Sequence, residues 1–178
     1  MKRFHFKKSS FILCLFCGLI LSSCYSFTAS SLQADIETVN IKPFPNNTAY
    51  NPDLSQQFTV DLQNRFLQRT NLKGATENPD LIIEGEITGY EIAPTSIATP
   101  TTSAQSGNVI QAAQNKLTIT VRVHYENVKY PDDSFDRTYT GEAVFNNDLS
   151  MQDIETGQVK IATERIINLI FNDIVANW

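Results

Sequence analysis

The stretch that decides the fold is NKLTITVRVHYENVKYPDDSFDRTYTGEAVF, residues 115–145. Apolar and polar side chains alternate along both of its halves, which is the period of a β-strand with one buried face and one polar face. The residues PDDS at 131–134 between the halves have the composition of a turn that joins two strands. We therefore expect an antiparallel hairpin in a sheet that is covered on one side only.

The preceding stretch, NPDLIIEGEITGYEI at 78–92, continues the same pattern. We expect one set of its residues to face the helices (Leu81, Ile83, Gly85, Ile87 and Gly89) and the alternate set, which includes Glu84, Glu86 and Tyr90, to face away. The glycines at 85 and 89 are expected to let a helix approach closely. Residues 94–114 are rich in Thr, Ser, Ala and Gln, which leaves two interpretations: a long excursion, or a continuation of the flanking strands beyond the body of the sheet.

Two other segments have the period of a helix. Leu54, Phe58, Leu62 and Phe66 recur every four residues, with Asn51 as the expected N-cap and Pro52 at the first position. The second helix is predicted over about 153–177. It carries one apolar stripe that we assign to the core (Ile154, Val159, Ala162, Ile166, Leu169, Ile170 and Ile174) and a second that could be core or a partner-covered surface (Ile167, Phe171, Val175 and Trp178).

Residues 36–44 complete the pattern, because Val39 and Ile41 alternate ahead of two prolines at 43 and 45. The order is thus strand, helix, strand, strand, strand, helix. A strand–helix–strand start favours a right-handed crossover with its two strands parallel. The predicted fold is α+β: a two-layer sandwich, with two helices packed on one face of a four-stranded mixed sheet.

The N-terminal segment is organised differently. Four basic residues within positions 1–8 precede an uncharged apolar run at 11–23, which is the layout of a secretory signal peptide. The run is too short for a membrane-spanning helix, which needs about 20 apolar residues. We predict that residues 1–23 are a removed signal peptide, that 24–35 are a lipidated tether, and that 36–178 form a single domain.

The residues Leu21-Ser22-Ser23-Cys24 resemble the bacterial lipobox. The resemblance implies cleavage between Ser23 and Cys24 and acylation of Cys24, and Tyr25 in the next position resembles the pattern of lipoproteins held at the outer membrane on its periplasmic side. Because the other two cysteines lie in the apolar run, Cys24 would be the only cysteine of the mature chain, and no internal disulfide could form. The alternative is an ordinary secretory cut with an incidental cysteine.

Charge and composition exclude several classes of function. Without residues 1–23, the chain keeps 155 residues, with 10 Lys and Arg against 19 Asp and Glu, a net charge of −9. A chain this acidic is not expected to bind nucleic acid, which needs clustered cations.

His124 would be the only histidine left, and no metal, nucleophile or phosphate-loop motif accompanies it, so no cofactor is expected. Glu84 and Glu86 share a strand face, which is compatible with a carboxylate pair but is expected of a solvated face. We therefore predict a binding or assembly protein and not an enzyme.

Two short stretches of the mature chain resemble the LptE family of lipopolysaccharide-assembly lipoproteins. The first is VNIKPFPNNT, in which the resemblance rests on Val39, Ile41, Phe44, Asn46 and Thr48. The second is NPDLIIEGEITGY, in which it rests on Asp80, Leu81, Gly85, Ile87 and Tyr90. The resemblance implies a protein that plugs and helps assemble an LptD-like outer-membrane β-barrel and that assists insertion of lipopolysaccharide into the outer leaflet.

Lipopolysaccharide carries phosphates, which call for Lys or Arg. Lys116, Arg122 and Arg137 are the candidate contacts; the alternative is that they are solvated strand residues balancing Glu126 and Asp136. A rival reading of the whole chain is a periplasmic lipoprotein that activates a cell-wall synthase or scaffolds a secretion complex. A carrier of a small ligand is a third.

Overall fold

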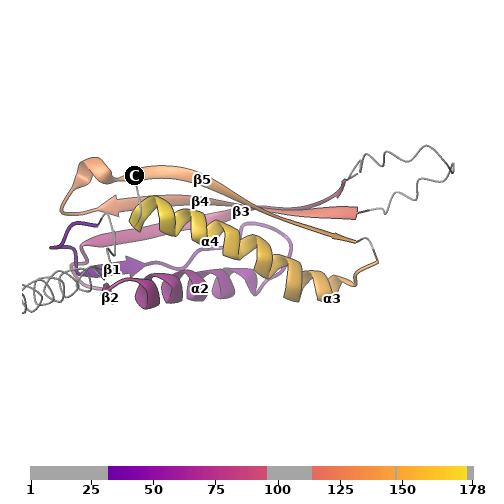
Figure 1. The fold of residues 1–178 in the computed structure, drawn as a ribbon, viewed down its shortest axis with the longest axis horizontal. Helices are drawn as coiled ribbons and strands as arrows, with labels where there is room; N and C mark the ends of the chain where they lie inside the picture. Colours follow the sequence, from indigo (N-terminus) through magenta and orange to yellow (C-terminus); the bar gives the residue numbers. More distant parts are fainter. Residues whose placement is uncertain (1–31, 96–113, 147, 176–178) are drawn as a thin grey trace, which may run out of the picture.

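The computed structural model describes residues 32–95, 114–146 and 148–175 (Figure 1). Cys24, the predicted signal peptide, most of the predicted tether and Trp178 lie outside these ranges. The strands are β1 (Thr38–Ile41), β2 (Lys73–Gly74), β3 (Leu81–Thr95), β4 (Gln114–Asn127) and β5 (Phe135–Asn146). The helices are α2 (Leu54–Arg69), α3 (Met151–Asp153) and α4 (Val159–Val175), with a π-helical segment at Ile154–Gln158 joining the last two.

The strands form one mixed sheet in the order β2-β1-β3-β4-β5, and α2 and α4 pack on it as a single layer (Figure 1). This confirms the predicted α+β sandwich, with five strands in place of four. The added strand, β2, has only two residues, both exposed, so it has no apolar alternation that a sequence pattern could reveal. Backbone hydrogen bonds hold it beside β1, from the Lys73 N–H to the Glu37 carbonyl (2.9 Å) and from the Ala75 N–H to the Val39 carbonyl (3.0 Å).

β1 lies parallel to β3 and is connected to it through α2, as the crossover rule predicts. Val39 pairs with Leu81 and Ile41 with Ile83. The prolines at 43 and 45 end the regular strand, yet the chain stays beside β3: the Ile87 N–H donates to the Pro45 carbonyl (2.9 Å) and the Asn47 N–H to the Ile87 carbonyl (3.0 Å). The N-terminal strand is thereby extended in irregular form along half of β3.

β3, β4 and β5 form an antiparallel meander. The β3–β4 ladder runs from Leu81 opposite Asn127 to Thr95 opposite Gln114. The two flanks of the Thr- and Ser-rich segment therefore continue the strands, up to Thr95 and from Gln114. Residues 96–113, the middle of that segment, lie outside the described residues.

A bulge in β3 changes which residues face the core. Ile87 pairs with Val121 and Gly89 with Thr120, so Thr88 is an extra residue. Residues 81–87 alternate as predicted, but beyond the bulge the sides reverse. Tyr90 packs against the core and Gly89 faces outward, opposite to the expectation. One inserted residue is enough for this reversal because side chains alternate with a period of two.

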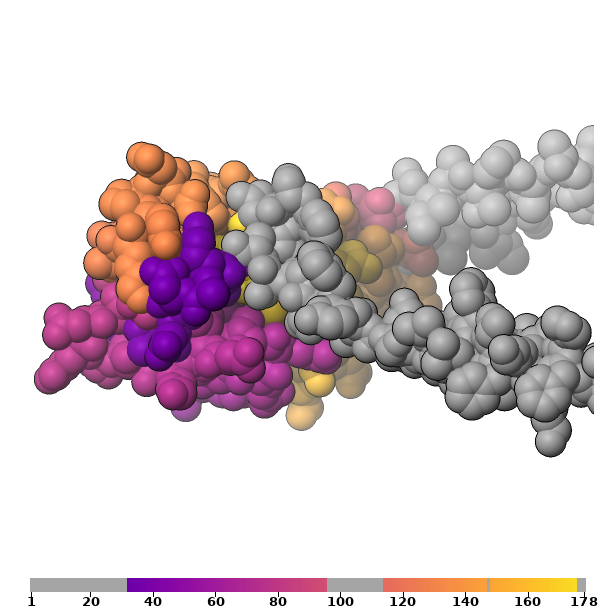
Figure 2. Space-filling view, turned by 60° about the vertical axis from the view of Figure 1, so that its left-hand side comes forward, coloured from indigo at the N-terminus to yellow at the C-terminus, as the bar shows by residue number. Residues whose placement is uncertain are grey.

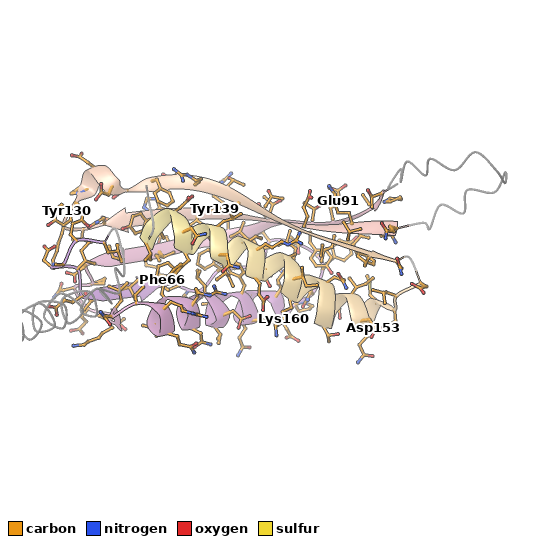
Figure 3. All side chains as sticks on the ribbon, in the orientation of Figure 1. Phe66, Glu91, Tyr130, Tyr139, Asp153 and Lys160 are labelled. Carbon is orange, nitrogen blue, oxygen red and sulfur yellow. The ribbon has the colours of Figure 1, made fainter. Side chains whose placement is uncertain are left out.

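The core lies between the sheet and the two helices. Leu54, Phe58, Leu62 and Phe66 of α2 are fully buried, and Figure 3 shows Phe66 between its helix and the sheet. α2 also covers the second apolar stripe of α4, since the Phe66 and Phe171 rings meet edge to face with centroids 5.3 Å apart. Ile167 and Val175 of that stripe are buried as well. Leu169, which the sequence analysis assigned to the core stripe, is instead 46% exposed.

Two local expectations are corrected. α2 begins at Leu54 with Asp53 as its N-cap, while Asn51 adopts φ 49° and its carbonyl accepts from the Leu54 N–H. The close helix approach occurs at Gly141 of β5, where a Cβ would overlap the carbonyl oxygen of Ala162 on α4. At Gly85 a Cβ would instead meet the Phe44 ring and the Arg122 carbonyl, so that glycine makes room for a side chain and a neighbouring strand.

Candidate functional site: the uncovered face of the sheet

The face of the sheet opposite the helices is polar, and no described element covers it. We call it the outer face. It consists of alternate residues of the three long strands, in rows set by the registers: Glu86, Arg122 and Thr138 form one row and Glu84, His124 and Asp136 another. Because each strand presents every second residue on one side, the polar alternation of the sequence becomes a continuous surface.

Ion pairs and a hydrogen bond across the strands order this outer face. Lys42 Nζ lies 2.5 Å from Glu84, Lys116 Nζ 2.7 Å from Glu142 and Arg122 Nη1 3.3 Å from Glu86. His124 Nδ1 lies within hydrogen-bond distance of the Asp136 carboxylate, at 3.0 Å. Exposed pairs of this kind contribute at most about 1 kcal/mol each. They orient the side chains more than they stabilise the fold, and their partners can be exchanged.

The structure brings two of the three candidate phosphate contacts onto this face. Lys116 and Arg122 both point outward from β4, six residues and about 20 Å apart. Arg137 lies on the opposite, helix-bearing side, opposite the buried Val123. The acidic partners of the three are Glu142, Glu86 and Asp173, not the Glu126 and Asp136 considered from the sequence.

Arg137 belongs to a cluster that joins α4 to β5. Its Nη1 is 2.5 Å from the Asp173 carboxylate, and its guanidinium stacks 4.6 Å from the centre of the Phe135 ring. The Tyr139 hydroxyl donates to the same carboxylate at 2.7 Å. Burial and this carboxylate raise the pKa of Tyr139, and Asp173 raises the pKa of Arg137. The arrangement holds the last turns of α4 against the sheet.

Carboxylates outnumber cations on the outer face. Six acidic side chains lie there (Glu84, Glu86, Glu91, Glu126, Asp136 and Glu142) against Lys42, Lys116 and Arg122. A bound phosphate would have to replace Glu142 beside Lys116 or Glu86 beside Arg122. The surface as a whole is therefore suited to polar protein contacts, with phosphate binding confined to individual cations.

Two cations that the sequence did not single out lie elsewhere. Arg69 at the end of α2 and Lys73 of β2 line a cavity of about 610 Å³ with Leu32, Ile36 and Leu72. Neither has an ion pair within the described ranges, unlike the cations of the outer face. No periodic signal marks them, because one closes a helix and the other lies in a strand of two residues.

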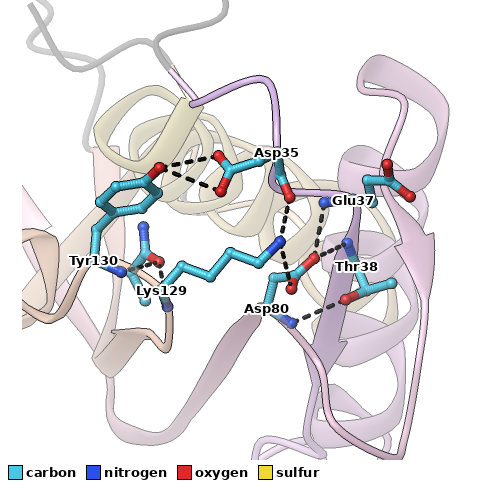
Figure 4. Close-up of polar contacts among 7 residues, drawn as sticks. Asp35, Glu37, Thr38, Asp80, Lys129 and Tyr130 are labelled. Atoms are coloured by element: carbon cyan, nitrogen blue, oxygen red, sulfur yellow. Dashed lines mark hydrogen bonds and ion pairs between the residues drawn. The ribbon is translucent and has the colours of Figure 1, made fainter.

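Sequence reasoning also missed a polar cluster at the end of the sheet, which we call the Asp80 clasp: Asp35, Glu37, Thr38, Asp80, Lys129 and Tyr130 (Figure 4). One Asp80 carboxylate oxygen accepts the backbone N–H groups of Glu37 (2.9 Å) and Thr38 (3.0 Å), and the other lies 2.9 Å from Lys129 Nζ. These contacts, the Glu37 N–H above all, hold the pKa of Asp80 well below its usual value. The isolated acid just before β3 was the signal that could have revealed it.

The clasp fixes the point at which the chain enters the domain. The Tyr130 hydroxyl donates to the Asp35 carboxylate at 3.1 Å, and Lys129 Nζ donates to the Asp35 carbonyl. Figure 2 shows the first described residues (indigo) lying between the β4–β5 connection and the region of α2 and β2. The predicted tether therefore joins the fold at a defined position, at the end of the sheet where β3 begins.

The residues that carried the family resemblance form one structural unit. Phe44 is fully buried and packs on Gly85, as noted above. The Asn46 side chain orders the following turn by donating to the carbonyls of Tyr50 (2.9 Å) and Asn51 (3.0 Å). The Tyr50 and Tyr90 rings stack with centroids 5.4 Å apart. The two stretches are thus the two sides of the β1–β3 junction.

Comparison with protein families matches residues 36–176 to the family described as "LptE: Lipopolysaccharide-assembly". No curated protein matches the chain. Among solved structures, the chain is similar to the hypothetical protein CT253 from Chlamydia trachomatis, with 10% identity and a TM-score of 0.50 over 79% of this chain and 99% of that one. It also resembles a minor lipoprotein from Acinetobacter baumannii (16% identity, TM-score 0.45, 80% and 92% covered) and the PelC dodecamer from Paraburkholderia phytofirmans (12%, 0.44, 83% and 96%).

The similarity to the chlamydial structure supports the fold alone. Among the described helices, none is both long enough and apolar enough to cross a membrane. The family match spans the domain from just before β1 to the end of α4, and it includes both stretches of the β1–β3 junction. The chain belongs to the LptE family of lipopolysaccharide-assembly proteins.

Proposed function

We propose that this protein is an outer-membrane lipoprotein that occupies the lumen of an LptD-like β-barrel, helps that barrel to assemble, and assists lipopolysaccharide insertion into the outer leaflet. Family membership supports the general role in lipopolysaccharide assembly. The observation that carries the finer proposal is the uncovered outer face. A barrel lumen is polar, and a wide sheet of Thr, Glu and Arg side chains can pair with such a wall.

The proposed mode of action is binding, with no catalytic step. Lys116 and Arg122 are proposed to contact lipopolysaccharide phosphates by exchanging their present partners, Glu142 and Glu86. The exchange is feasible because both ion pairs are exposed and therefore weak. Arg137 is a less suitable contact than the sequence indicated, since it is already engaged by Asp173 and Phe135.

The protein is further proposed to be held on the periplasmic side of the outer membrane by acyl chains on Cys24, after removal of residues 1–23. Acyl chains stabilise membrane association by about 0.8 kcal/mol per buried CH₂. Mass spectrometry of the mature N-terminus tests this proposal. An unmodified Cys24, or a chain that starts elsewhere, would contradict it.

Co-purification after mild detergent extraction tests the partner. A very large outer-membrane β-barrel is the expected companion. Recovery of a cell-wall synthase or a multimeric pore in its place would favour the rival function of an activator or scaffold.

Charge reversal tests the lipid contacts. The double variant K116E/R122E should capture several-fold less lipopolysaccharide in a pull-down, because each phosphate contact contributes through a charge-assisted hydrogen bond. K160E is the control for a single charge reversal, since Lys160 is an exposed cation of α4, away from the outer face (Figure 3). Equal capture by both variants would remove Lys116 and Arg122 from the lipid site while leaving the barrel partnership intact.

A further inference from the structure

The two edges of the sheet differ strongly. At one edge, β2 has two residues, and one of them is Lys73, which suits an edge that must not pair with other chains. At the other edge, β5 has 12 residues and, among the described strands, pairs only with β4, in a register unbroken from Tyr125 opposite Phe135 to Gln114 opposite Asn146. β5 forms the outer margin of the sheet (Figure 1).

The backbone groups along this margin are available. Arg165 Nη1 donates to the Glu142 carbonyl at 2.6 Å, so this carbonyl points away from β4. Because backbone direction alternates along an antiparallel strand, the N–H and C=O groups of Asp136, Thr138, Thr140 and Val144 point the same way. Within the described ranges none of these four residues has a backbone hydrogen bond on that side.

Natural proteins protect an open edge with charged side chains, above all lysine, or with proline, a bulge, a short strand or a covering element. β5 is long, contains neither proline nor lysine, and has no bulge in its ladder with β4. Its charged residues are Asp136, Arg137 and Glu142, and an uncharged stretch at 138–141 separates Arg137 from Glu142. The bulge of this sheet lies in β3, away from the margin. The edge therefore retains the features of a strand that pairs with a further strand.

Side chains beside the edge define what would pair with it. One side of α4 presents three residues at intervals of four: Arg165, Leu169 and Asp173. Arg165 and Asp173 both contact β5. Leu169 between them is 46% exposed and lies along the margin on the helix side. The side chains that β5 itself presents on the outer face include the acids Asp136 and Glu142 and no cation.

We propose that an extended segment of another protein adds to β5 as a sixth strand. Main-chain hydrogen bonds to the free groups of β5 would hold it, as in other cases of strand addition. Its side chains would alternate: apolar ones would cover Leu169, and basic ones would lie beside Asp136 and Glu142. A second copy of this chain fits less well. Its β5 would place its own Asp136 and Glu142, with no cation, beside the acids of the first copy.

A synthetic peptide of about ten residues with alternating valine and lysine tests this, and a block peptide of the same composition is the control. The protein is the full lipidated chain in mild detergent, and amide hydrogen exchange is followed by NMR. The alternating peptide should slow exchange of the Thr138, Thr140 and Val144 amides by about tenfold or more. Unchanged exchange at these amides would overturn the proposal, as would equal protection by the block peptide, which would indicate charge attraction alone.

Two variants sharpen the test. Thr140→Pro removes an outward N–H that β4 does not use, whereas Thr140→Val keeps the N–H and removes only the hydroxyl. The proline variant should bind the alternating peptide about tenfold more weakly and the valine variant should bind it normally. If Thr140→Pro does not fold, Leu169→Lys takes its place, since Leu169 is exposed and its change should lower affinity and leave folding intact.

The outcomes separate this proposal from the plug function. Edge protection that appears with protein concentration and without peptide would identify a second copy as the occupant and overturn the assignment. The peptide measurement needs no β-barrel. Failure of barrel co-purification and failure of edge pairing are therefore distinguishable results.

Discussion

At the scale of single residues, Asp80 links separate segments of the chain at the start of β3. Its carboxylate joins two backbone N–H groups of the chain entering β1 to Lys129 at the end of β4. Hydrogen bonds to a charged group contribute about 1.5–3 kcal/mol. Asp80→Asn should lower the free energy of unfolding by about 2 kcal/mol, measured by urea denaturation. Asp132→Asn on the exposed β4–β5 connection is the control and should change little.

The depressed pKa of Asp80 also predicts a pH dependence. In the unfolded chain the carboxyl group has its ordinary pKa of 3.8, whereas in the folded protein its pKa is lower. The stabilisation is therefore complete above about pH 4 and is lost progressively as the pH falls toward the folded pKa. Denaturation at about pH 6 and about pH 3 should show the gap between wild type and Asp80→Asn narrowing at the lower pH. A gap that is constant with pH would contradict the role of the charge.

Gly85 offers a second test at this scale. A Cβ there would overlap the Arg122 carbonyl and the Phe44 ring, so Gly85→Ala should destabilise the fold by about 1–3 kcal/mol. Gly74→Ala is the control: a Cβ at Gly74 meets nothing within 4 Å, and the change should stay within about 0.5 kcal/mol. Thermal unfolding of the two variants decides the matter. Equal stability would mean that both the Phe44 ring and the β4 backbone at Arg122 can shift at no cost.

The candidate site shows what residue types alone cannot reveal. Lys116, Arg122 and Arg137 are all cations of amphipathic strands, although Lys116 and Arg122 belong to the polar set of their strand and Arg137 to the apolar set that holds Phe135 and Tyr139. The β4–β5 register places two of them outward and the third inward, beside Asp173 of a helix 36 residues away. A partner so distant in sequence cannot be inferred from spacing.

At the scale of elements, the two helices contact each other as well as the sheet. Phe66→Ala should cost about 3–5 kcal/mol, because Phe66 is fully buried and its ring meets Phe171 of α4. Its neighbour Leu67 is 44% exposed, and Leu67→Ala should change the free energy of unfolding by about 0.5 kcal/mol or less. Chemical denaturation of the pair tests the helix–helix contact. Similar losses in both variants would place the helix in a different orientation.

Most elements were predictable because their amphipathic periods are strong. The four-residue spacing of Leu54 to Phe66 and the alternation from Leu117 to Tyr125 reflect burial directly. The bulge at Thr88 and the strand β2 were not predictable. The bulge leaves only a short trace in the sequence, where the core-facing apolar residues change from Ile83 and Ile87 to Tyr90 and Ile92. The strand β2 is held by backbone hydrogen bonds to β1.

At the scale of the whole molecule, the described residues form one core between the sheet and the two helices. Among the described residues, every fully buried side chain belongs to the span 36–175, from the entry into β1 to the end of α4. A Cys24→Ala protein made without the signal peptide should therefore unfold in one cooperative thermal transition. Its midpoint should match that of the lipidated protein. A molten or aggregated product would show that the barrel or the membrane is part of the fold.

The position of β1 inside the sheet governs the order in which the fold can form. β1 pairs on both sides with strands that follow it in the chain, β2 and β3, and Val39 finds its partner Leu81 only after all of α2. Strand pairs whose residues lie so far apart in the sequence form slowly, whereas the β4–β5 hairpin forms across a short connection. If the chain is exported N-terminus first, as proposed, β1 emerges earliest and has no neighbouring strand until β2 and β3 follow. During that interval its apolar residues and both of its edges would be open, which would expose this segment to chaperones.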